Sequence, residues 1–274
     1  YLPRLARGEG LFAFGLTEPD AGSDSRGSRT KAVENPDGSW TIDGSKIFIT
    51  NGSNELTDGI IVQSVSSRSP DGTPEFTCFI VEKGTPGFTS KRMHKKLMWR
   101  ASDTAELYFS GVKVQASAML GKRGAGSRQM LKTLDSGRLS IAAMGLGCAQ
   151  GAYEAALEYS RNRHQFGKPL SRFQAIAFKL ADMAVKIEHA RTFLYRACWL
   201  RDTGKPFGTE SAMAKLYCSE TAQWVANEAV QIHGGYGLMK EFPVERFYRD
   251  QRLLQIGEGT SEIQRMVISR AIGC

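Results

Sequence analysis

The sequence predicts an α+β fold in which a small antiparallel β-barrel or sandwich precedes an antiparallel helical bundle. Residues 11 to about 116 carry short β-rich runs that Pro and Gly separate, with no helical period between them. From about residue 124 the apolar residues recur at helical spacing instead. Because strands and helices are segregated along the chain, the order does not match a dinucleotide-binding βαβ fold.

Turn residues and β-rich runs define the strands of the first half. Asp43-Gly44, between residues 40–42 and 46–50, predicts a hairpin, because Asp-Gly supplies the positive φ that a tight turn needs. Further strands are expected over 60–64, 75–81 and 105–114. Short strands at this spacing are typical of a small barrel or sandwich. We therefore expect a central β domain over residues 1–118 and a helical domain over residues 119–274.

The second half predicts long helices with short connections. In the clearest one, apolar residues from Phe173 to Cys198 recur at intervals of three, four and seven, and Thr203-Gly204 ends the helix. Other helices are expected over 128–162 and 210–233, after Pro243, and after Thr260. Long helices joined in this way pack as an antiparallel bundle.

Composition limits the possible classes of protein. The net charge of +8 comes partly from basic runs at 91–100 and 161–172, but no recognition motif accompanies them, so nucleic-acid binding is not expected. Either run can be a solvated face or a contact for polyphosphate groups. No apolar run is long enough to cross a bilayer, and the five scattered cysteines lack metal-ligand spacing. The chain starts at Tyr1 without an initiator Met, so we interpret it as a fragment.

Three polar or glycine-rich segments are candidates for ligand contacts. Residues 15–24 expose hydroxyls and N–H groups that suit a heterocycle or phosphate, or form an ordinary polar loop. The cations of residues 161–168 either bind an anion or cap a helix. Residues 231–237 form a Gly-rich helix end, which is either a simple cap or a place where a ligand approaches the backbone. This last segment follows a helix, so it is not a Rossmann turn.

A fourth segment, residues 256–265, contains a candidate base. Thr260 or Ser261 can cap the last helix, whose N-terminus then favours an anionic group. Glu258 lies between Gly257 and Gly259, immediately before this cap. It is either a solvated loop carboxylate or a base whose small neighbours let a substrate lie against it.

Together, and in this order, the four segments resemble the acyl-CoA dehydrogenase family. The first matches the family's signature around the flavin ring. A second family signature matches Gln231 to Asp250, with Gly234, Gly235, Gly237, Glu241 and Arg246 at the expected spacing. The family's barrel motif matches Trp99-Arg100-Ala101-Ser102 with Thr104 and Glu106-Leu107. The resemblance implies an N-terminal helical domain, absent from this sequence, then a central β domain and a C-terminal four-helix bundle.

The resemblance also implies ligands and partners. It implies FAD as cofactor, an acyl-CoA as substrate, electron-transferring flavoprotein as partner, and a homotetramer. The location would be cytoplasmic in a bacterium and the mitochondrial matrix in a eukaryote. The implied FAD contacts are Phe14, Leu16, Thr17, Gly22, Ser23, Phe48, Ile49, Thr50, Arg163, Gln174, Gln231, Ile232, His233, Gly234, Gly235, Thr260, Ser261 and Glu262. The implied acyl-CoA contacts are Ser23, Asp135, Ser136, Gly137, Arg138 and Gly259.

Some of these residues have a more specific implied role. Thr50 should lie near flavin N5, and Arg163 and Gln174 should hold the pyrophosphate together with residues 231–235 of another subunit. Arg163 and residues 231–235 are thus expected to serve cofactors in different subunits. Glu258 should remove the α-proton of the thioester while the β-hydride passes to N5, giving the trans-2-enoyl-CoA.

The sequence departs from the family pattern at several positions. Some branches carry the base on the first bundle helix, where this chain has Gly137. Phe48 replaces a frequent Trp, Gly257 a frequent Tyr, and Met98 a usual Gly. Short, branched, medium and aromatic acyl groups all stay open as substrates. The alternative function is a truncated, inactive family member that acts as a subunit or scaffold.

Overall fold

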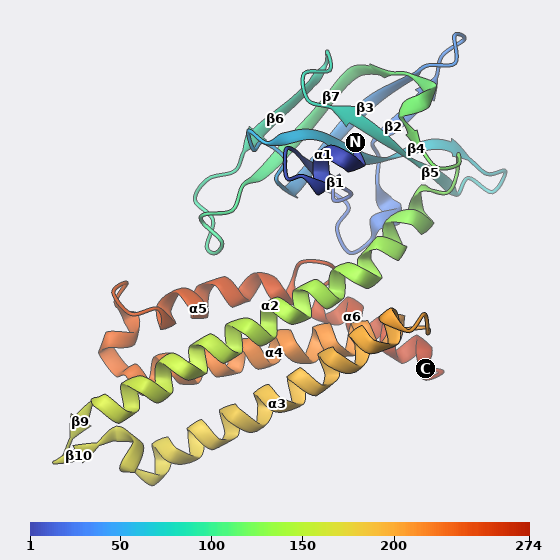
Figure 1. The fold of residues 1–274 in the computed structure, drawn as a ribbon. Helices are drawn as coiled ribbons and strands as arrows, with labels where there is room; N and C mark the ends of the chain where they lie inside the picture. The colour runs from blue at the N-terminus through green and yellow to red at the C-terminus, as the bar shows by residue number, and fades with distance from the viewer. The chain divides into compact units, whose positions relative to one another are not determined.

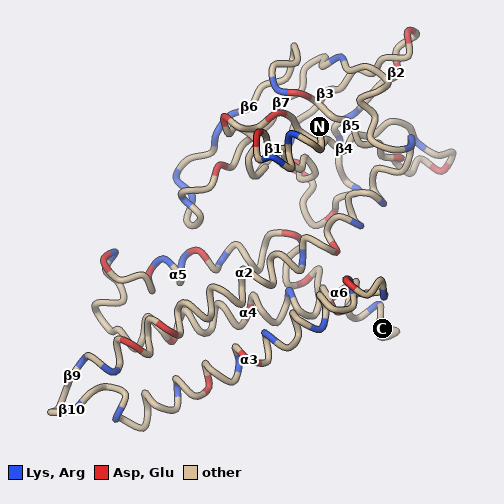
Figure 2. The backbone as a smooth tube through the Cα atoms, viewed as in Figure 1, with Lys and Arg blue, Asp and Glu red and all other residues tan.

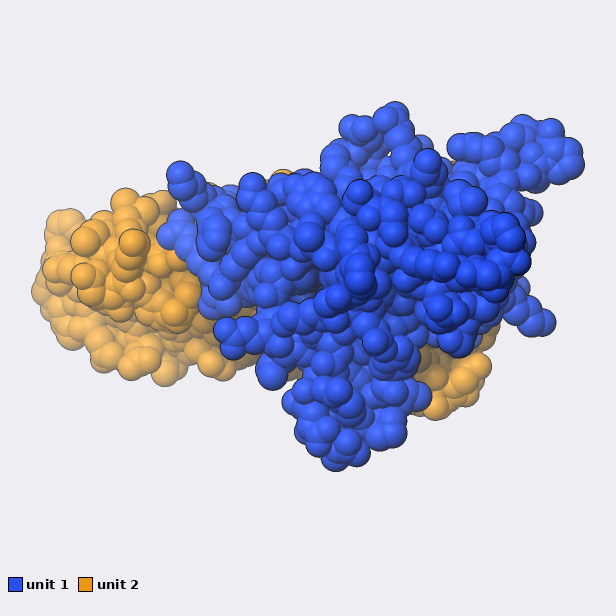
Figure 3. All heavy atoms as spheres, turned by 90° about the horizontal axis from the view of Figure 1, so that it is seen from above, with its two compact units in different colours: residues 1–132 blue, residues 133–274 orange.

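The computed structural model describes residues 1–274, which form two compact units, Tyr1–Lys132 and Thr133–Cys274 (Figure 3). The first contains a sheet rich in antiparallel pairs and the second is helical, so the predicted α+β class is confirmed (Figure 1). The division expected after residue 118 stays a prediction. No helix is both long and apolar enough to span a membrane.

The first unit contains one eight-stranded sheet in the order β6-β7-β3-β2-β4-β5-β8, with β1 beside β4. The strands are β1 (Leu11–Gly15), β2 (Lys31–Glu34), β3 (Trp40–Thr50), β4 (Thr57–Arg68), β5 (Pro74–Glu82), β6 (Phe88–Arg92), β7 (Thr104–Val114) and β8 (Met119–Leu120). The strands predicted over 60–64, 75–81 and 105–114 lie within β4, β5 and β7. Most pairs are antiparallel, but β1 and β2 each pair with β4 in parallel.

The core of this unit comes from the inward side chains of its central strands. Ile42 of β3, Ile60 and Val62 of β4, Phe79 of β5 and Leu107 of β7 are completely buried. Successive strand residues point to opposite faces, so every second residue of β3 near Ile42 points inward. This packed layer fixes the position of β3, whose far end carries several candidate residues.

The hairpin predicted at Asp43-Gly44 is wrong, because β3 runs unbroken through this dipeptide and pairs with β7. Its register shifts between Ile42 and Gly44, which marks a β-bulge. Gly44 has a φ of +145°, and a Cβ there would lie 2.7 Å from the Cα of Thr30. Glycine is therefore needed at position 44 because the segment around Thr30 approaches closely, and not because the chain reverses its direction there.

The second unit is built on three long helices and shorter C-terminal ones, each near its predicted place (Figure 1). The helices are α2 (Gly126–Asn162), which begins in the first unit, α3 (Gln174–Asp202), α4 (Gly208–His233), α5 (Val244–Asp250) and α6 (Ser261–Ala271). The first unit also holds the short α1 (Leu2–Ala6). One core joins α2, α3 and α4, with Leu146, Met183, Leu194 and Val225 among its buried residues.

The long helices α2, α3 and α4 run in alternating directions, so their ends gather at the two ends of the bundle. The hairpin of β9 (His164–Gln165) and β10 (Lys168–Pro169) links α2 to α3, which returns along the bundle before α4 runs back (Figure 1). The last residues of α2 and α4 therefore lie at the same end. Their early residues lie at the other end, together with α6, which packs on α4.

Gly44→Ala is expected to lower the free energy of unfolding by about 3 kcal/mol, because the methyl group meets the backbone of Thr30 at a left-handed φ. Gly38→Ala is the control. Gly38 also has a positive φ, +79°, but no atom lies within 4 Å of a Cβ built on it, so only about 1 kcal/mol of backbone strain is expected. Urea unfolding measures both variants. Equal losses would show that the Thr30 contact is unimportant.

Candidate functional site

In the first unit, the loop after β1 is bound to the far half of β3. The N–H of Ile47 donates to the carbonyl of Thr17 at 2.9 Å. The Lys46 ammonium donates to the carbonyl of Leu16 at 3.0 Å. These bonds bring two of the predicted cofactor contacts, Leu16 and Thr17, next to the strand that carries a third, Phe48.

A buried ion pair holds this loop in place. Lys46 Nζ lies 2.8 Å from Glu18 Oε1, and the Glu18 carboxylate also accepts the N–H groups of Arg29 at 2.6 Å and Thr30 at 3.0 Å. Burial opposes the charged form of Glu18, but the Lys46 ammonium and these donors outweigh it and hold the pKa of Glu18 below its ordinary value. Lys46 was not predicted, although a lysine at an inward position of β3 was a usable signal.

Phe48 has an exposed ring on a strained backbone. Its φ is +60°, its exposed fraction is 62%, and the register of β3 against β7 shifts between Lys46 and Ile49. Left-handed φ values are unusual for bulky residues and cluster at ligand sites. Ile49 is only 3% exposed, so its side chain belongs to the core and only its backbone is available to a cofactor. Thr50, Gly22 and Ser23 are exposed and Phe14 is partly exposed.

The basic run at 91–100 extends from the end of β6 into the loop before β7, where Lys and Arg positions gather along the backbone (Figure 2). Most of its side chains are exposed. Lys91, Lys95 and Arg100 are exposed. Lys96 is committed internally, because its ammonium donates to the Ser102 carbonyl at 2.6 Å and to the Thr104 hydroxyl at 2.8 Å. Its role is to close the loop.

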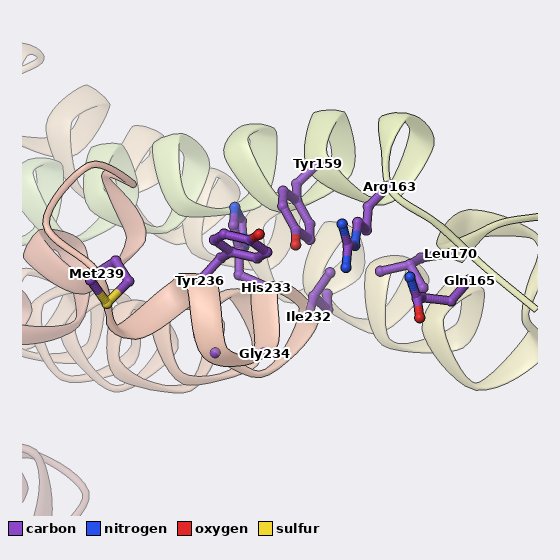
Figure 4. Close-up of a pocket in the computed structure, with 10 residues that line it drawn as sticks. Tyr159, Arg163, Gln165, Leu170, Ile232, His233, Gly234, Tyr236 and Met239 are labelled. Atoms are coloured by element: carbon purple, nitrogen blue, oxygen red, sulfur yellow. The ribbon is translucent and has the colours of Figure 1, made fainter.

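In the second unit, a hollow of about 620 Å³ lies at the end of the bundle where α2 and α4 finish (Figure 4). Its lining is Tyr159, Arg163, Gln165, Leu170, Ile232, His233, Gly234, Gly235, Tyr236 and Met239. The predicted contacts Arg163 and Ile232 to Gly235 thus come together, whereas Gln174 and Gln231 are not in the lining. Arg163 and residues 232–235 share one hollow of one chain, which does not support the expectation that they serve cofactors in different subunits. Because α2 and α4 run in the same direction, their ends meet.

The hollow combines a free cation with open backbone. The Arg163 guanidinium lies 5.5 Å from the centre of the Tyr236 ring and makes no ion pair with an acid of this chain. No atom lies within 4 Å of a Cβ built on Gly234 or Gly235, so a ligand can approach the backbone there. A guanidinium beside open backbone suits a pyrophosphate, and the exposed Phe48 ring suits a flat heterocycle. The residues present therefore fit FAD.

His233 is a neutral structural residue of this hollow. It is 4% exposed, its ring stacks on Tyr159 with centroids 4.2 Å apart, and Nδ1–H donates to the Ala229 carbonyl at 2.8 Å. Burial lowers the pKa of His233, and the hydrogen bond to Ala229 only partly opposes this. Its imidazole therefore adds shape to the hollow and no positive charge.

At the other end of the bundle, Glu258 lies on a strained turn and its carboxylate contacts α2. Its φ is +56° and that of Gly259 is +90°. A Cβ on Gly137 would lie 2.5 Å from Glu258 Oε2 and 2.9 Å from its Cδ. Gly137 thus leaves the space that the carboxylate occupies. We call residues Gly257 to Gly259 the Glu258 turn.

The charges around Glu258 act in opposite directions. Burial raises its pKa above the ordinary value, while Arg138 and Lys215 partly counteract this. Arg138 is 6% exposed and its Nη1 donates to Asp135 Oδ1 at 2.8 Å. Two of the predicted substrate contacts, Asp135 and Arg138, therefore bind each other. Ser136 is exposed and Gly137 faces the carboxylate.

Two buried side chains that were not predicted hold the Glu258 turn. Lys215 Nζ donates to the Gly259 carbonyl at 2.8 Å. Gln264 Nε2 donates to the same carbonyl at 2.8 Å and to that of Glu258 at 3.2 Å. The available signal was weak: Lys215 lies on the buried face of α4, where most of the other residues are small.

The predicted cap of the last helix is confirmed. Thr260 Oγ1 accepts the N–H of Ile263 at 3.3 Å, so α6 begins at Ser261. Ser261 is 7% exposed and its hydroxyl has no partner, while Glu262 is exposed. The three residues predicted to contact FAD here thus stand at the helix start, directly after the Glu258 turn.

Comparison with known proteins agrees with this arrangement. Residues 13–112 match the middle domain of acyl-CoA dehydrogenases and residues 124–273 their C-terminal domain. A probable acyl-CoA dehydrogenase, YngJ of Bacillus subtilis (strain 168), is 49% identical over 99% of this chain and 71% of that protein. A short-chain-specific acyl-CoA dehydrogenase of Megasphaera elsdenii is 48% identical over 99% of this chain and 70% of that protein.

Solved structures share the fold as well. The structure of butyryl-CoA dehydrogenase from Megasphaera elsdenii matches with a TM-score of 0.95 at 49% identity, covering 99% of this chain and 70% of that one. A glutaryl-CoA dehydrogenase from Mycobacterium smegmatis in complex with FADH2 matches with a TM-score of 0.93 at 33% identity, covering 100% of this chain and 68% of that one. The chain belongs to the acyl-CoA dehydrogenase family of FAD-dependent oxidoreductases, which dehydrogenate acyl-CoA thioesters.

Proposed function

We propose that Glu258 is the base that removes the α-proton of a short-chain acyl-CoA in this chain's dehydrogenation reaction. The observation that carries the proposal is the position of its carboxylate, half-buried on a strained turn and seated against Gly137. The small residues on both sides of Glu258 and at position 137 leave room for a thioester beside it. The other acids of the predicted site lack this combination, since Asp135 is paired with Arg138 and Glu262 is exposed.

The chemistry follows from the environment of the carboxylate. An α-proton of a thioester is weakly acidic, so its base must be close and more basic than an ordinary carboxylate. Partial burial supplies that basicity, and it also favours the neutral acid that Glu258 becomes after taking the proton. The chemistry that FAD would supply when bound is that of an acceptor for the hydride of the β-carbon. The backbone N–H of Glu258 is the proposed donor to the thioester oxygen, where negative charge develops.

We propose that Arg163, Gly234 and Gly235 hold the pyrophosphate of an FAD. For the first unit, taken by itself, we propose that Phe48 lies against a flavin ring. The hollow and the Glu258 turn are far apart in one chain. Ile232 of α4 lines the hollow and Lys215 of the same helix contacts the turn. At 1.5 Å per residue, roughly 25 Å of helix separates these two residues. A hollow so placed suits a cofactor that serves the base of a second copy. Exposed apolar side chains along α3, namely Phe178, Val185, Tyr195 and Trp199, support contact with further copies in the proposed homotetramer.

The proposed substrate and partner rest on the relatives. Proteins named short-chain specific come from Megasphaera elsdenii, Clostridium acetobutylicum and, as a mitochondrial protein, Rattus norvegicus. A Cβ on Gly257 would meet only ordinary contacts, at 3.6 Å or more, so its missing side chain leaves space beside the base. One structural neighbour is described as the electron-transferring flavoprotein of Acidaminococcus fermentans. We propose such a flavoprotein as the electron acceptor, and the compartment stays a prediction.

Glu258→Gln is expected to keep the yellow colour and acyl-CoA binding while flavin reduction slows by about 10²–10⁴-fold, because an amide cannot accept the α-proton. Single-turnover bleaching of the flavin by butyryl-CoA measures this. Bleaching within about tenfold of the original rate would mean that the base lies elsewhere. If neither protein bleaches with any acyl-CoA that binds, the chain is the inactive scaffold.

Gly137→Ala tests the space that the carboxylate occupies. The new methyl group would displace Glu258 Oε2, and misplacing a reacting group by about 1 Å can cost on the order of 10²-fold in rate. We expect bleaching to slow on that scale while the melting temperature holds, because the clash is with a movable side-chain end. Gly147→Ala on the same helix, with nothing within 4 Å of its Cβ, is the control and should react normally.

Arg163→Ala is expected to raise the dissociation constant of FAD by about 10- to 100-fold, the range for lost hydrogen bonds to a charged group. Lys168→Ala is the matched control on the neighbouring hairpin. Its ammonium lies 4.4 Å from the Phe173 ring centre and does not line the hollow, so little change is expected. Fluorescence titration of the apoprotein with FAD compares them, and equal constants would argue against the pyrophosphate assignment.

A further inference from the structure

Lys215 is a fully buried cation for which the dehydrogenation chemistry has so far given no role. Its side chain extends from α4 with no exposed surface, and its ammonium makes no ion pair within 4.0 Å. Its one hydrogen bond goes to the carbonyl of Gly259, directly after the proposed base, at 2.8 Å. Burying an ammonium is unfavourable unless nearby charges or dipoles compensate it. A lysine in this position therefore needs an explanation beyond packing.

Lys215 and Gln264 together hold the strained backbone of the Glu258 turn. Both donate to the Gly259 carbonyl at 2.8 Å, and Gln264 also reaches the Glu258 carbonyl. They come from different helices, α4 and α6, so the turn is held from two sides. The two side chains make a similar hydrogen bond, but only Lys215 brings a charge.

We propose that Lys215 is a positioning residue for Glu258, which fixes the turn through Gly259 and supplies buried positive charge that favours the carboxylate form of the base. The proposal rests on the proposed function in which Glu258 takes the α-proton. The charged groups that act on Glu258 are Arg138 of α2, which is paired with Asp135, and Lys215 of α4. Lys215 in turn is influenced by Arg138, Glu258, Glu220 of α4 and Glu262 of α6. Asp135 neutralises much of the Arg138 charge, whereas Lys215 has no such close partner.

The test compares the FAD-loaded protein with its Lys215→Met, Lys215→Arg and Gln264→Met variants. The first readout is the pH dependence of flavin bleaching by butyryl-CoA in a single turnover. The second is infrared titration of the Glu258 carboxyl group, identified as the band that Glu258→Gln removes. This second readout does not require the enzyme to turn over.

Removing a neighbouring cation destabilises the carboxylate, so Lys215→Met should raise both pH midpoints. We expect a shift of about one pH unit, the low end for an adjacent opposite charge, and hence about tenfold slower bleaching below both midpoints. Gln264→Met loses a bond to the same carbonyl without losing charge, so its rate should fall with the midpoint unchanged. Lys215→Arg should retain the original midpoint. Because burial lowers the pKa of Lys215 to about 8, the difference should shrink above that pH.

Each result decides the proposal. An unchanged infrared midpoint in Lys215→Met overturns it, as does an equal shift in Gln264→Met. If Lys215→Met does not fold, Lys215→Gln replaces it, and if neither neutral variant folds while Lys215→Arg does, the role of Lys215 is structural and the proposal is wrong. If the infrared midpoint shifts but Glu258→Gln still bleaches, Lys215 does control Glu258 and it is the proposed function that fails.

Discussion

The contact between the Glu258 carboxylate and Gly137 is the constraint on which the proposed chemistry depends. The carboxylate occupies the volume that a side chain at position 137 would need. This volume can therefore hold a side chain from α2 or the carboxylate of Glu258, but not both. Position 137 is also where other branches of the family are expected to carry their base. The structure supplies a steric reason for that alternation, because the two sources of a carboxylate compete for the same volume.

Backbone strain and buried charge occur together at both candidate regions. Phe48 and Glu258 both have left-handed φ values, and each lies near a buried lysine that binds a backbone carbonyl of the adjoining loop or turn. Such strain persists only when the surroundings impose it. Lys46 does so together with the Glu18 carboxylate, whereas Lys215 does so together with the neutral amide of Gln264. The second arrangement leaves its positive charge available to the proposed base.

Much of the fold was accessible from sequence, because the relevant signals are local. The period of α3, the Thr260 cap and the strands β4, β5 and β7 follow from spacing and turn chemistry. The hairpin prediction at Asp43-Gly44 was wrong because this dipeptide suits both a tight turn and a β-bulge. Only the proximity of Thr30, which the sequence does not show, distinguishes the bulge from the turn. Lys46, Lys215 and Gln264 escaped notice because their partners are backbone carbonyls or acids distant in the chain, which no spacing rule identifies.

The separation of the hollow from the Glu258 turn has a genetic consequence. If, as proposed, the hollow of one copy holds the cofactor that serves the base of another, each reaction centre draws on two gene products. A lesion at Arg163 then damages a neighbour's centre, while a lesion at Glu258 damages its own. Two alleles that are each inactive alone can therefore restore intact centres when their products assemble together, so that mixed populations show intragenic complementation.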